Sequence, residues 1–291
     1  MAALSYFIAL PFLYFLSLLP FRLLYVLSDF FFFFLYHIIG YRRKVVMTNL
    51  RNSFPEKSED EIRRTCKEFY RYFCDLFLET FKTLTISRGA MLRHCRFNPS
   101  GKLLIDNLAD EGRSFIIVMG HQGNWEWAGN TFSLLCRHQL YVIYHPLSNK
   151  YFNSLLYKMR TRFGTKLIAM KDTFRDMVNN KNELNATAFI ADQTPPPDKA
   201  YWMNFLNQDT PVFMGAEKIA RKMKYPVVYV SAEKEKRGYY RLHAELLSSP
   251  PFDEPDGEIA MLYTKRLEND IVKQPPTWLW THKRWKHKRK Q

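Results

Sequence analysis

The chain has 291 residues, of which 47% are hydrophobic, so it can bury the core of one large domain or of two modest ones. Its formal net charge of +15 indicates an anionic partner: nucleic acid, an anionic membrane surface or a phosphorylated substrate. The four cysteines show neither a CxxC motif nor metal-ligand spacing, which favours reduced thiols in a reducing compartment over a cysteine metal site.

The first forty residues are dominated by Leu, Phe, Tyr and Ile. The apolar runs at 4–19 and 23–39 are both shorter than the roughly 20 residues that a spanning helix needs, and the second contains Asp29. Three interpretations stay open: a spanning helix broken by proline, a re-entrant or interfacial hairpin, and a buried pair of core helices. We expect residues 1–40 to attach the chain to a membrane, because the phenylalanines at 30–34 leave no polar face for water.

A cleaved signal peptide is less favoured, because no basic segment precedes the apolar run and no small-residue cleavage site follows it. Arg42, Arg43 and Lys44 follow the run directly. By the positive-inside rule, these cations predict that the rest of the chain lies in the cytoplasm.

A helix is predicted to begin after Ser58, because Ser58 and Glu61 form an S-x-x-E capping box. Apolar residues then repeat at helical spacing as far as Phe81. We expect an amphipathic helix with its apolar face on the core.

After Gly101, helical and strand-like segments alternate. We expect helices at 102–110, 125–137, 151–163, 172–182, 212–222 and 257–272, and strands at 114–119, 140–144, 166–170, 186–191, 226–230 and 239–246. The last strand alternates polar and apolar residues, as an edge strand does. This order predicts an α/β fold with a largely parallel sheet covered on both faces. No repeat or long linker interrupts it, so we expect one domain over residues 41–285.

The stretch VMGHQGNWEWAG follows the buried strand at 114–119. In open α/β sheets, reactive groups gather at the carboxyl ends of strands, where His121 is expected. Glu126 falls in the first turn of the next helix and can reach back to the imidazole. A carboxylate on one ring nitrogen leaves the other free as a base, which suits removal of a hydroxyl proton. The alternative is a structural histidine beside a solvated glutamate.

Other chemistries lack their motifs. The chain contains no G-x-S-x-G, no HExxH, no phosphate-binding G-x-x-x-x-G-K-[ST] loop and no G-x-G-x-x-G. We therefore expect neither a metal nor a cofactor. A base without an evident protein nucleophile indicates direct transfer from a preactivated donor to an acceptor hydroxyl.

GHQGNWEW resembles the H-x4-[DE] motif of membrane-associated acyltransferases. The ordered motifs YHPLSN, MRTRFG, ADQTPPPDKAYWMNFLNQDT, PVFMGAEKIARK and WLWTHKRWK extend the resemblance to the bacterial lipid A biosynthesis late acyltransferases over most of the chain. One position departs from that family: His145 stands where its Tyr-Arg-Pro motif has arginine. The departure leaves open whether position 145 takes over the arginine's role in substrate binding.

The resemblance implies a mixed, mainly parallel sheet flanked by helices, like that of glycerol-3-phosphate acyltransferases. It implies that His121 is the general base and that Glu126 orients it. The donor would be an acyl-carrier-protein thioester or acyl-CoA. The acceptor would be a hydroxyl of a membrane glycolipid, a lipid A precursor, on the cytoplasmic face of a bacterial inner membrane. A transferase for another lyso-lipid or aminolipid, and an inactive membrane scaffold, are the alternatives.

Four basic residues lie in and beside the motif MRTRFG: Lys158, Arg160, Arg162 and Lys166. If the segment is helical throughout, Lys158 and Arg162 share a face, as do Arg162 and Lys166. By the resemblance, Arg160 and Arg162 hold the acceptor phosphate or stabilise the oxyanion. The alternative is solvation of a helix end.

Two further residues are candidates for binding substrate. Asp192 ends a buried strand, where it serves either a polar site or a loop cap. Trp202 lies in a segment that lines either an acyl groove or the core.

The segment after residue 280 is strongly basic, and residues 286–291 form its tail. Its cations, with Trp278, Trp280 and Trp285, suit an anionic membrane interface. The chain has no recognition helix, RNA-binding aromatic motif or zinc-finger spacing, so we do not expect it to bind nucleic acid. A solvated tail beyond Trp285 is the alternative.

Overall fold

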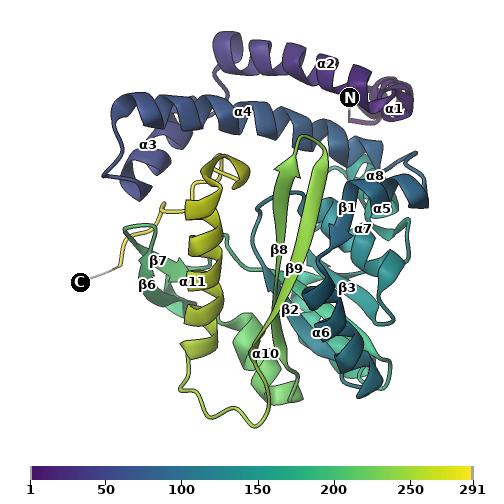
Figure 1. The fold of residues 1–291 in the computed structure, drawn as a ribbon, viewed down its shortest axis with the longest axis vertical. Helices are drawn as coiled ribbons and strands as arrows, with labels where there is room; N and C mark the ends of the chain where they lie inside the picture. The colour runs from purple at the N-terminus through teal and green to yellow at the C-terminus, as the bar shows by residue number, and fades with distance from the viewer. Residues whose placement is uncertain (1, 290–291) are drawn as a thin grey trace.

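A seven-stranded sheet forms the centre of the molecule in a computed structural model, which describes residues 2–289 (Figure 1). The strand order is β1-β9-β8-β2-β5-β3-β4. All neighbouring strands are parallel except β8 and β9, which confirms the mixed, mainly parallel sheet. The strands are β1 (Cys95–Phe97), β2 (Phe115–Met119), β3 (Gln139–Tyr144), β4 (Lys166–Ala169), β5 (Asn185–Ile190), β8 (Val227–Lys236) and β9 (Tyr239–Ser248).

Helices cover both faces of the sheet. They are α1 (Ala2–Leu18), α2 (Phe21–Phe33), α3 (Arg43–Ser53), α4 (Glu59–Lys82), α5 (Arg88–His94), α6 (Pro99–Asp110), α7 (Trp125–Leu135), α8 (Lys150–Thr161), α9 (Thr173–Asn179), α10 (Gly215–Met223) and α11 (Glu258–Lys273). A π-helical turn, η1 (Phe34–Ile39), continues α2, and the 3-10 turns are η2 (Met170–Asp172), η3 (Pro197–Lys199) and η4 (Pro275–Thr277).

The central strand β2 is buried on both faces, because its side chains alternate between two cores. Ile116 and Val118 join the cluster that contains α10 and α11, whereas Phe115 and Ile117 join the one that contains α6 and α7. An uninterrupted apolar run is therefore the correct signature for this strand.

Two sequence expectations are wrong: the position of one strand in the sheet and the start of one helix. The strand at 239–246 is not at the edge of the sheet, because β1 pairs with the outer side of β9. The helix expected at 212–222 begins only at Gly215, because Val212 ends a two-stranded antiparallel ribbon made of β6 (Tyr201–Phe205) and β7 (Gln208–Val212). Pro and polar residues in β7 obscure its strand pattern.

The N-terminal helices lie across one end of the domain, on α4 (Figure 1). The predicted capping box is present, because Ser58 accepts from the Glu61 backbone and Glu61 accepts from the Ser58 backbone. Among the described helices, the continuous segment Phe21–Ile39 is long and apolar enough to cross a membrane.

Trp278 and Trp280 are buried, whereas the sequence analysis placed them at a membrane interface. Their exposed fractions are 2% and 0%, and their rings pack edge to face with centroids 4.7 Å apart. The C-terminal segment therefore runs through the core beside α3, where Asn49 donates to the carbonyl of Trp280.

Candidate functional site

His121 and Asp192 are brought together by the register of two parallel strands. Met119, the last residue of β2, pairs with Ile190, the last residue of β5. The amide of Ala191 donates to the carbonyl of Met119, which extends the pairing by one residue. Each side chain lies two positions beyond its strand end, so the two meet at the carboxyl edge of the sheet.

The loop between β2 and α7 is held in one conformation. Gly123 has a φ of +57°, and a Cβ there would lie 1.7 Å from the carbonyl oxygen of Ala232, so only glycine fits. Asn124 caps α7 by accepting from the amide of Trp127. The hydroxyl of Tyr72 donates to the carbonyl of Gly123. The position of His121 is therefore determined by contacts on both sides of the loop.

The carboxylate of Asp192 accepts three hydrogen bonds. His121 Nδ1 donates to Oδ1 at 2.6 Å, while the His121 amide and the Trp278 indole each donate to Oδ2 at 2.8 Å. Burial alone would raise the pKa of Asp192, but the adjacent His121 ring and these hydrogen bonds lower it to about 2. The ionised carboxylate keeps a proton on Nδ1 and leaves Nε2 as the basic nitrogen. The side-chain amide nitrogen of Gln193 lies 3.4 Å from Nε2 of His121.

Glu126 lies beside the site but does not hold the imidazole, contrary to the sequence expectation. Its carboxylate accepts from Nε and Nη2 of Arg160, at 2.9 Å for Nε to Oε2. Burial would raise the pKa of Glu126, but the Arg160 guanidinium lowers it, and Glu126 in turn raises the pKa of Arg160. The physical reason is geometric: Asp192 already occupies Nδ1, and α8 brings a bidentate partner to Glu126.

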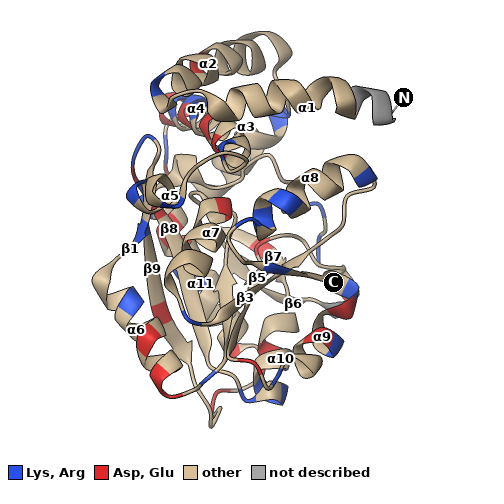
Figure 2. Cartoon of the chain, turned by 90° about the vertical axis from the view of Figure 1, so that its right-hand side faces the viewer, with Lys and Arg blue, Asp and Glu red and all other residues tan. Residues whose placement is uncertain are grey.

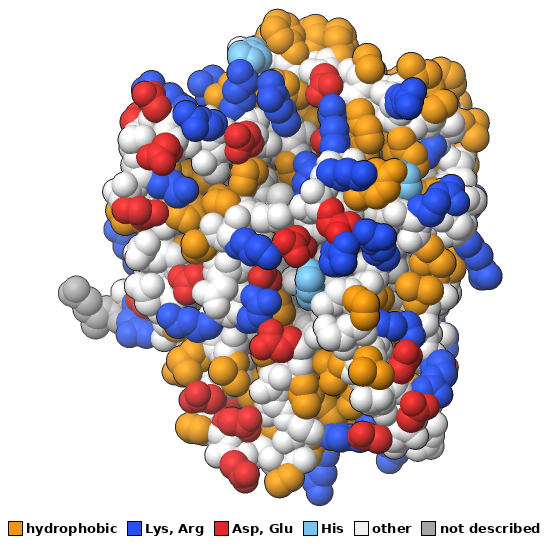
Figure 3. All heavy atoms as spheres, viewed as in Figure 1, with side chains coloured by type: hydrophobic (Ala, Val, Ile, Leu, Met, Phe, Trp, Pro, Cys, Tyr) orange, Lys and Arg blue, Asp and Glu red, His pale blue; other side chains and the backbone are white. Residues whose placement is uncertain are grey.

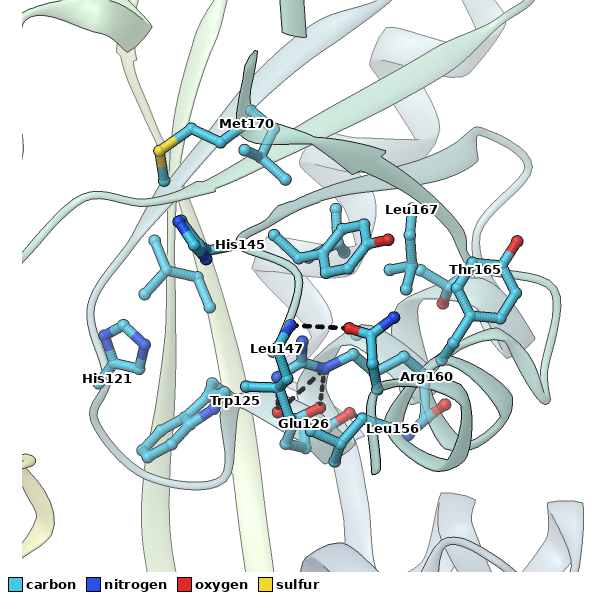
Figure 4. A pocket seen from close by; sticks show the side chains of 18 of the residues that line it. His121, Trp125, Glu126, His145, Leu147, Leu156, Arg160, Thr165, Leu167 and Met170 are labelled. Carbon is cyan, nitrogen blue, oxygen red and sulfur yellow. Dashed lines mark hydrogen bonds and ion pairs between the residues drawn. The ribbon is translucent and has the colours of Figure 1, made fainter. Parts of the chain in front are cut away.

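A cavity of about 370 Å³ opens in front of these residues. Figure 4 shows His121 at one side of it, with Trp125 next to the ring and the Glu126–Arg160 pair farther along. The rings of Trp125 and His121 lie edge to face, with their centroids 5.0 Å apart. The cavity thus places a histidine and an ion pair against a largely apolar wall, which consists of Val142, Ile143, Leu147, Leu156, Leu167, Met170 and Ile190.

The four basic residues expected to cluster around residue 160 do not share one site. Arg160 lines the cavity, whereas Arg162 donates to the carbonyl of Thr83. Lys158 donates to the hydroxyl of Tyr14 at 2.9 Å. The expected shared face of Arg162 and Lys166 is wrong, because α8 ends at Thr161 and Lys166 begins β4.

His145 and Trp202 have different surroundings. His145 is exposed and lines the cavity, and its Nδ1 donates to the carbonyl of Pro146 at 3.0 Å. Trp202 is in β6 and is not among the residues that line the cavity, and the Arg289 guanidinium lies 5.6 Å from its ring centroid.

Sequence reasoning missed Trp278 and Gln193. Gln193 follows Asp192 directly, so the strand end that predicted Asp192 also marks it. Trp278 carried no such signal, because a bridge between Gln122 and Trp278 joins the loop to a segment far along the chain.

Among residues 2–289, no group of three or more His, Cys, Asp or Glu side chains is arranged to hold a metal ion. Three of the cysteines, Cys66, Cys74 and Cys95, are buried, and burial raises the pKa of each thiol. Within the described part of the chain, the cavity lining contains no cysteine or serine, and its groups that can accept a proton include His121, Glu126 and His145.

In a comparison with known protein families, residues 1–287 match the model of the bacterial lipid A biosynthesis acyltransferase family. No curated protein matches the chain.

Proposed function

Because this chain belongs to the bacterial lipid A biosynthesis acyltransferase family, we propose that it moves a fatty acyl group from a thioester to a hydroxyl with His121 as the base. The family transfers fatty acyl groups to lipid A precursors, and this chain is an acyltransferase of that kind. In our proposal Asp192, rather than Glu126, orients the imidazole.

The contact between His121 Nδ1 and Asp192 Oδ1, at 2.6 Å, is the observation that carries the proposal. It favours a proton on Nδ1, and in our proposal the basic Nε2 is the nitrogen that meets the substrate. His121 is 17% exposed at its side chain, whereas Asp192 is 3% exposed. A ring that reaches the cavity, backed by a buried carboxylate, is the arrangement of a general base with its orienting partner.

The reaction requires one proton to be moved twice. Nε2 of His121 removes the proton of the acceptor hydroxyl as its oxygen attacks the thioester carbonyl carbon. The tetrahedral intermediate then collapses, the carbon–sulfur bond breaks, and the imidazolium returns the proton to the departing thiolate. Asp192 stabilises the imidazolium through its negative charge and stays ionised throughout.

Arg160 is our candidate for stabilising the oxyanion or an acceptor phosphate. It grips Glu126 through Nε and Nη2, and Nη1 is not used in this pair. The Arg160 side chain is 28% exposed and lines the cavity, so a negative charge that develops there meets a fixed cation. Glu126 acts in this scheme by holding Arg160 in place.

The apolar wall of the cavity suits the acyl chain, and the two histidines and Arg160 suit the polar ends of the reactants. We assign acyl carrier protein or acyl-CoA as the donor and a lipid A precursor hydroxyl as the acceptor. The enzyme would act at the cytoplasmic face of the inner membrane, because both donors are cytoplasmic thioesters. A transferase for another lyso-lipid or an aminolipid uses the same chemistry on a different acceptor.

The test is acyl transfer by the full-length protein in lipid vesicles, with acyl-CoA and acyl carrier protein compared as donors. We expect His121→Ala to lower turnover by roughly 10²–10⁴-fold. His243→Ala is the matched control, because His243 also binds a carboxylate, Glu233 at 2.8 Å, outside the cavity. Unchanged turnover in folded His121→Ala contradicts the mechanism.

The acceptor is tested with lipid A precursors that carry or lack phosphate, and with an aminolipid. Loss of the phosphate should reduce transfer in the wild type more than in Arg160→Ala if Arg160 binds it. Preference for the aminolipid supports the alternative acceptor. No transfer to any of these acceptors, by folded wild-type protein, supports an inactive scaffold.

A further inference from the structure

We propose that α1, α2 and η1 lie flat in one leaflet of a membrane and do not cross it, so that the lipid surface binds their outer face. This topology goes beyond the proposed reaction and does not depend on it. The argument rests on the direction of the helices, on what their two faces contact, and on the break between them.

Both helices run across the long axis of the molecule. Figure 1 shows α2 lying alongside α4, both roughly perpendicular to the vertical long axis, and Figure 2, turned by 90° about that axis, shows α1 roughly perpendicular to it as well. The two helices therefore lie in one layer at the end of the domain. A bilayer parallel to that layer contacts both helices along their whole length.

The outer face of this layer is apolar. Phe12 and Phe15 on α1, Val26 and Phe33 on α2, and Ile38 on η1 are each more than half exposed, at 51%, 61%, 67%, 53% and 62%. Figure 3 shows hydrophobic side chains gathered along the top edge of the molecule, where these helices lie. An exposed apolar patch of this kind marks a membrane or protein contact.

The inner face is fastened to the domain by polar groups. Ser28 donates to Asp75 at 2.7 Å, and Arg237 bridges Asp75 to Asp29, at 2.7 and 2.8 Å. Lys82 donates to the carbonyl of Ser17 at 2.7 Å. These contacts come from α4 and from the turn between β8 and β9, so they attach the end of α1 and the middle of α2 directly to the folded domain.

That attachment is incompatible with a spanning α2. Asp29 and Ser28 lie near the centre of the apolar segment Phe21–Ile39. If this segment crossed the bilayer, Arg237, Asp75 and the end of the β8–β9 hairpin would sit at the depth of the hydrocarbon core. Charged side chains there are costly, and exposed irregular backbone is not tolerated.

The break between α1 and α2 points the same way, because the two helices do not form one continuous apolar helix. Pro20 then begins α2 in a new direction.

Cations border the apolar layer and fit anionic headgroups. Arg43 lies over the Tyr36 ring at 4.6 Å and Arg71 over the Phe32 ring at 5.1 Å, and both side chains are exposed. Burial of apolar side chains in the leaflet and attraction of the arginines to anionic headgroups both bind an interfacial helix pair of this kind.

The first experiment maps topology in the full-length chain, with short epitope tags at three positions: before residue 1, between Leu19 and Pro20, and after residue 291. Antibody binding to sealed inverted and right-side-out vesicles reports the side of each tag. We expect all three tags on the same side. A Leu19–Pro20 tag on the opposite side means a two-span hairpin, and an N-terminal tag opposite the C-terminal one means a single span. Either result overturns the proposal.

The second experiment measures binding to vesicles of phosphatidylethanolamine and phosphatidylglycerol by flotation. Phe15→Glu and Phe33→Glu should each lower the ratio of bound to free protein roughly tenfold or more, because each removes a large apolar side chain from the leaflet. Phe174→Glu on α9 is the control, since Phe174 is also an exposed phenylalanine, at 36%.

A second copy of the chain is the competing occupant of the apolar face. In that case the two variants convert a dimer to a monomer and leave vesicle binding unchanged, which overturns the proposal. Neither readout uses acyl transfer, so a failure of the proposed reaction leaves this topology standing, and the reverse also holds.

Discussion

Replacing Asp192 with asparagine separates the orienting role of this residue from its role in packing. Asparagine has one accepting oxygen, whereas the three donors on Asp192 are the Nδ1 and amide of His121 and the indole of Trp278. If the amide oxygen takes the place of Oδ2, the two fixed N–H donors stay paired and the NH2 group faces Nδ1. The reverse orientation sets the NH2 group against both fixed donors, at about 1–3 kcal/mol for each unsatisfied group.

The first orientation is therefore the stable one, and it changes the tautomer of His121. Nδ1 must then accept, so the ring proton moves to Nε2 and the base toward the substrate is lost. We expect Asp192→Asn to lower turnover by about 10²–10⁴-fold, which is the usual contribution of a positioned base. The Michaelis constants should change little, because Asp192 does not reach substrate in our scheme.

The assay is the initial rate of acyl transfer, with the thermal midpoint of each variant measured in parallel. Glu126→Gln is the informative comparison, since the sequence alone favoured Glu126 as the orienting carboxylate. Near-normal turnover in folded Asp192→Asn, together with a large loss in Glu126→Gln, would refute our assignment and restore that first interpretation.

Three further results are expected. Arg160→Gln should lower the free energy of unfolding by about 3 kcal/mol, because it leaves the largely buried Glu126 carboxylate unpaired. The double variant Arg160→Gln, Glu126→Gln should recover part of this loss, as measured by chemical denaturation. Removal of residues 1–40 should move the chain from the membrane fraction of a flotation gradient to the aggregated fraction, because it uncovers Leu78 and other apolar side chains under α1 and α2. A soluble monomer contradicts this. Burial lowers the pKa of His282 to about 4, so as the pH falls this side chain is protonated in the unfolded chain before it is protonated in the folded one. The contribution of neutral His282 to the free energy of unfolding should therefore be fully present above about pH 6.5 and decline toward pH 4. The decline, measured by thermal midpoints, should be smaller in His282→Asn.

Local patterns in the sequence predicted much of the fold. The capping box at Ser58, the apolar run that became β2, and the alternation of strands and helices depend on neighbouring residues, so they can be recognised without the rest of the chain. The edge position expected for β9 was wrong, since three-residue β1 carries too short a pattern to be recognised as its partner.

The sequence by itself determined that a histidine and a carboxylate follow two buried strands, at His121 and Asp192, because strand ends are marked by local hydrophobicity. Only the tertiary structure decided that these two residues meet, because the meeting depends on strand order and on the register that pairs Met119 with Ile190. Glu126 is closer in sequence to His121 than Asp192 is, yet α8 brings Arg160 to it. Sequence distance limits which groups can approach one another, but hydrogen-bond geometry in the folded chain selects the pair that forms.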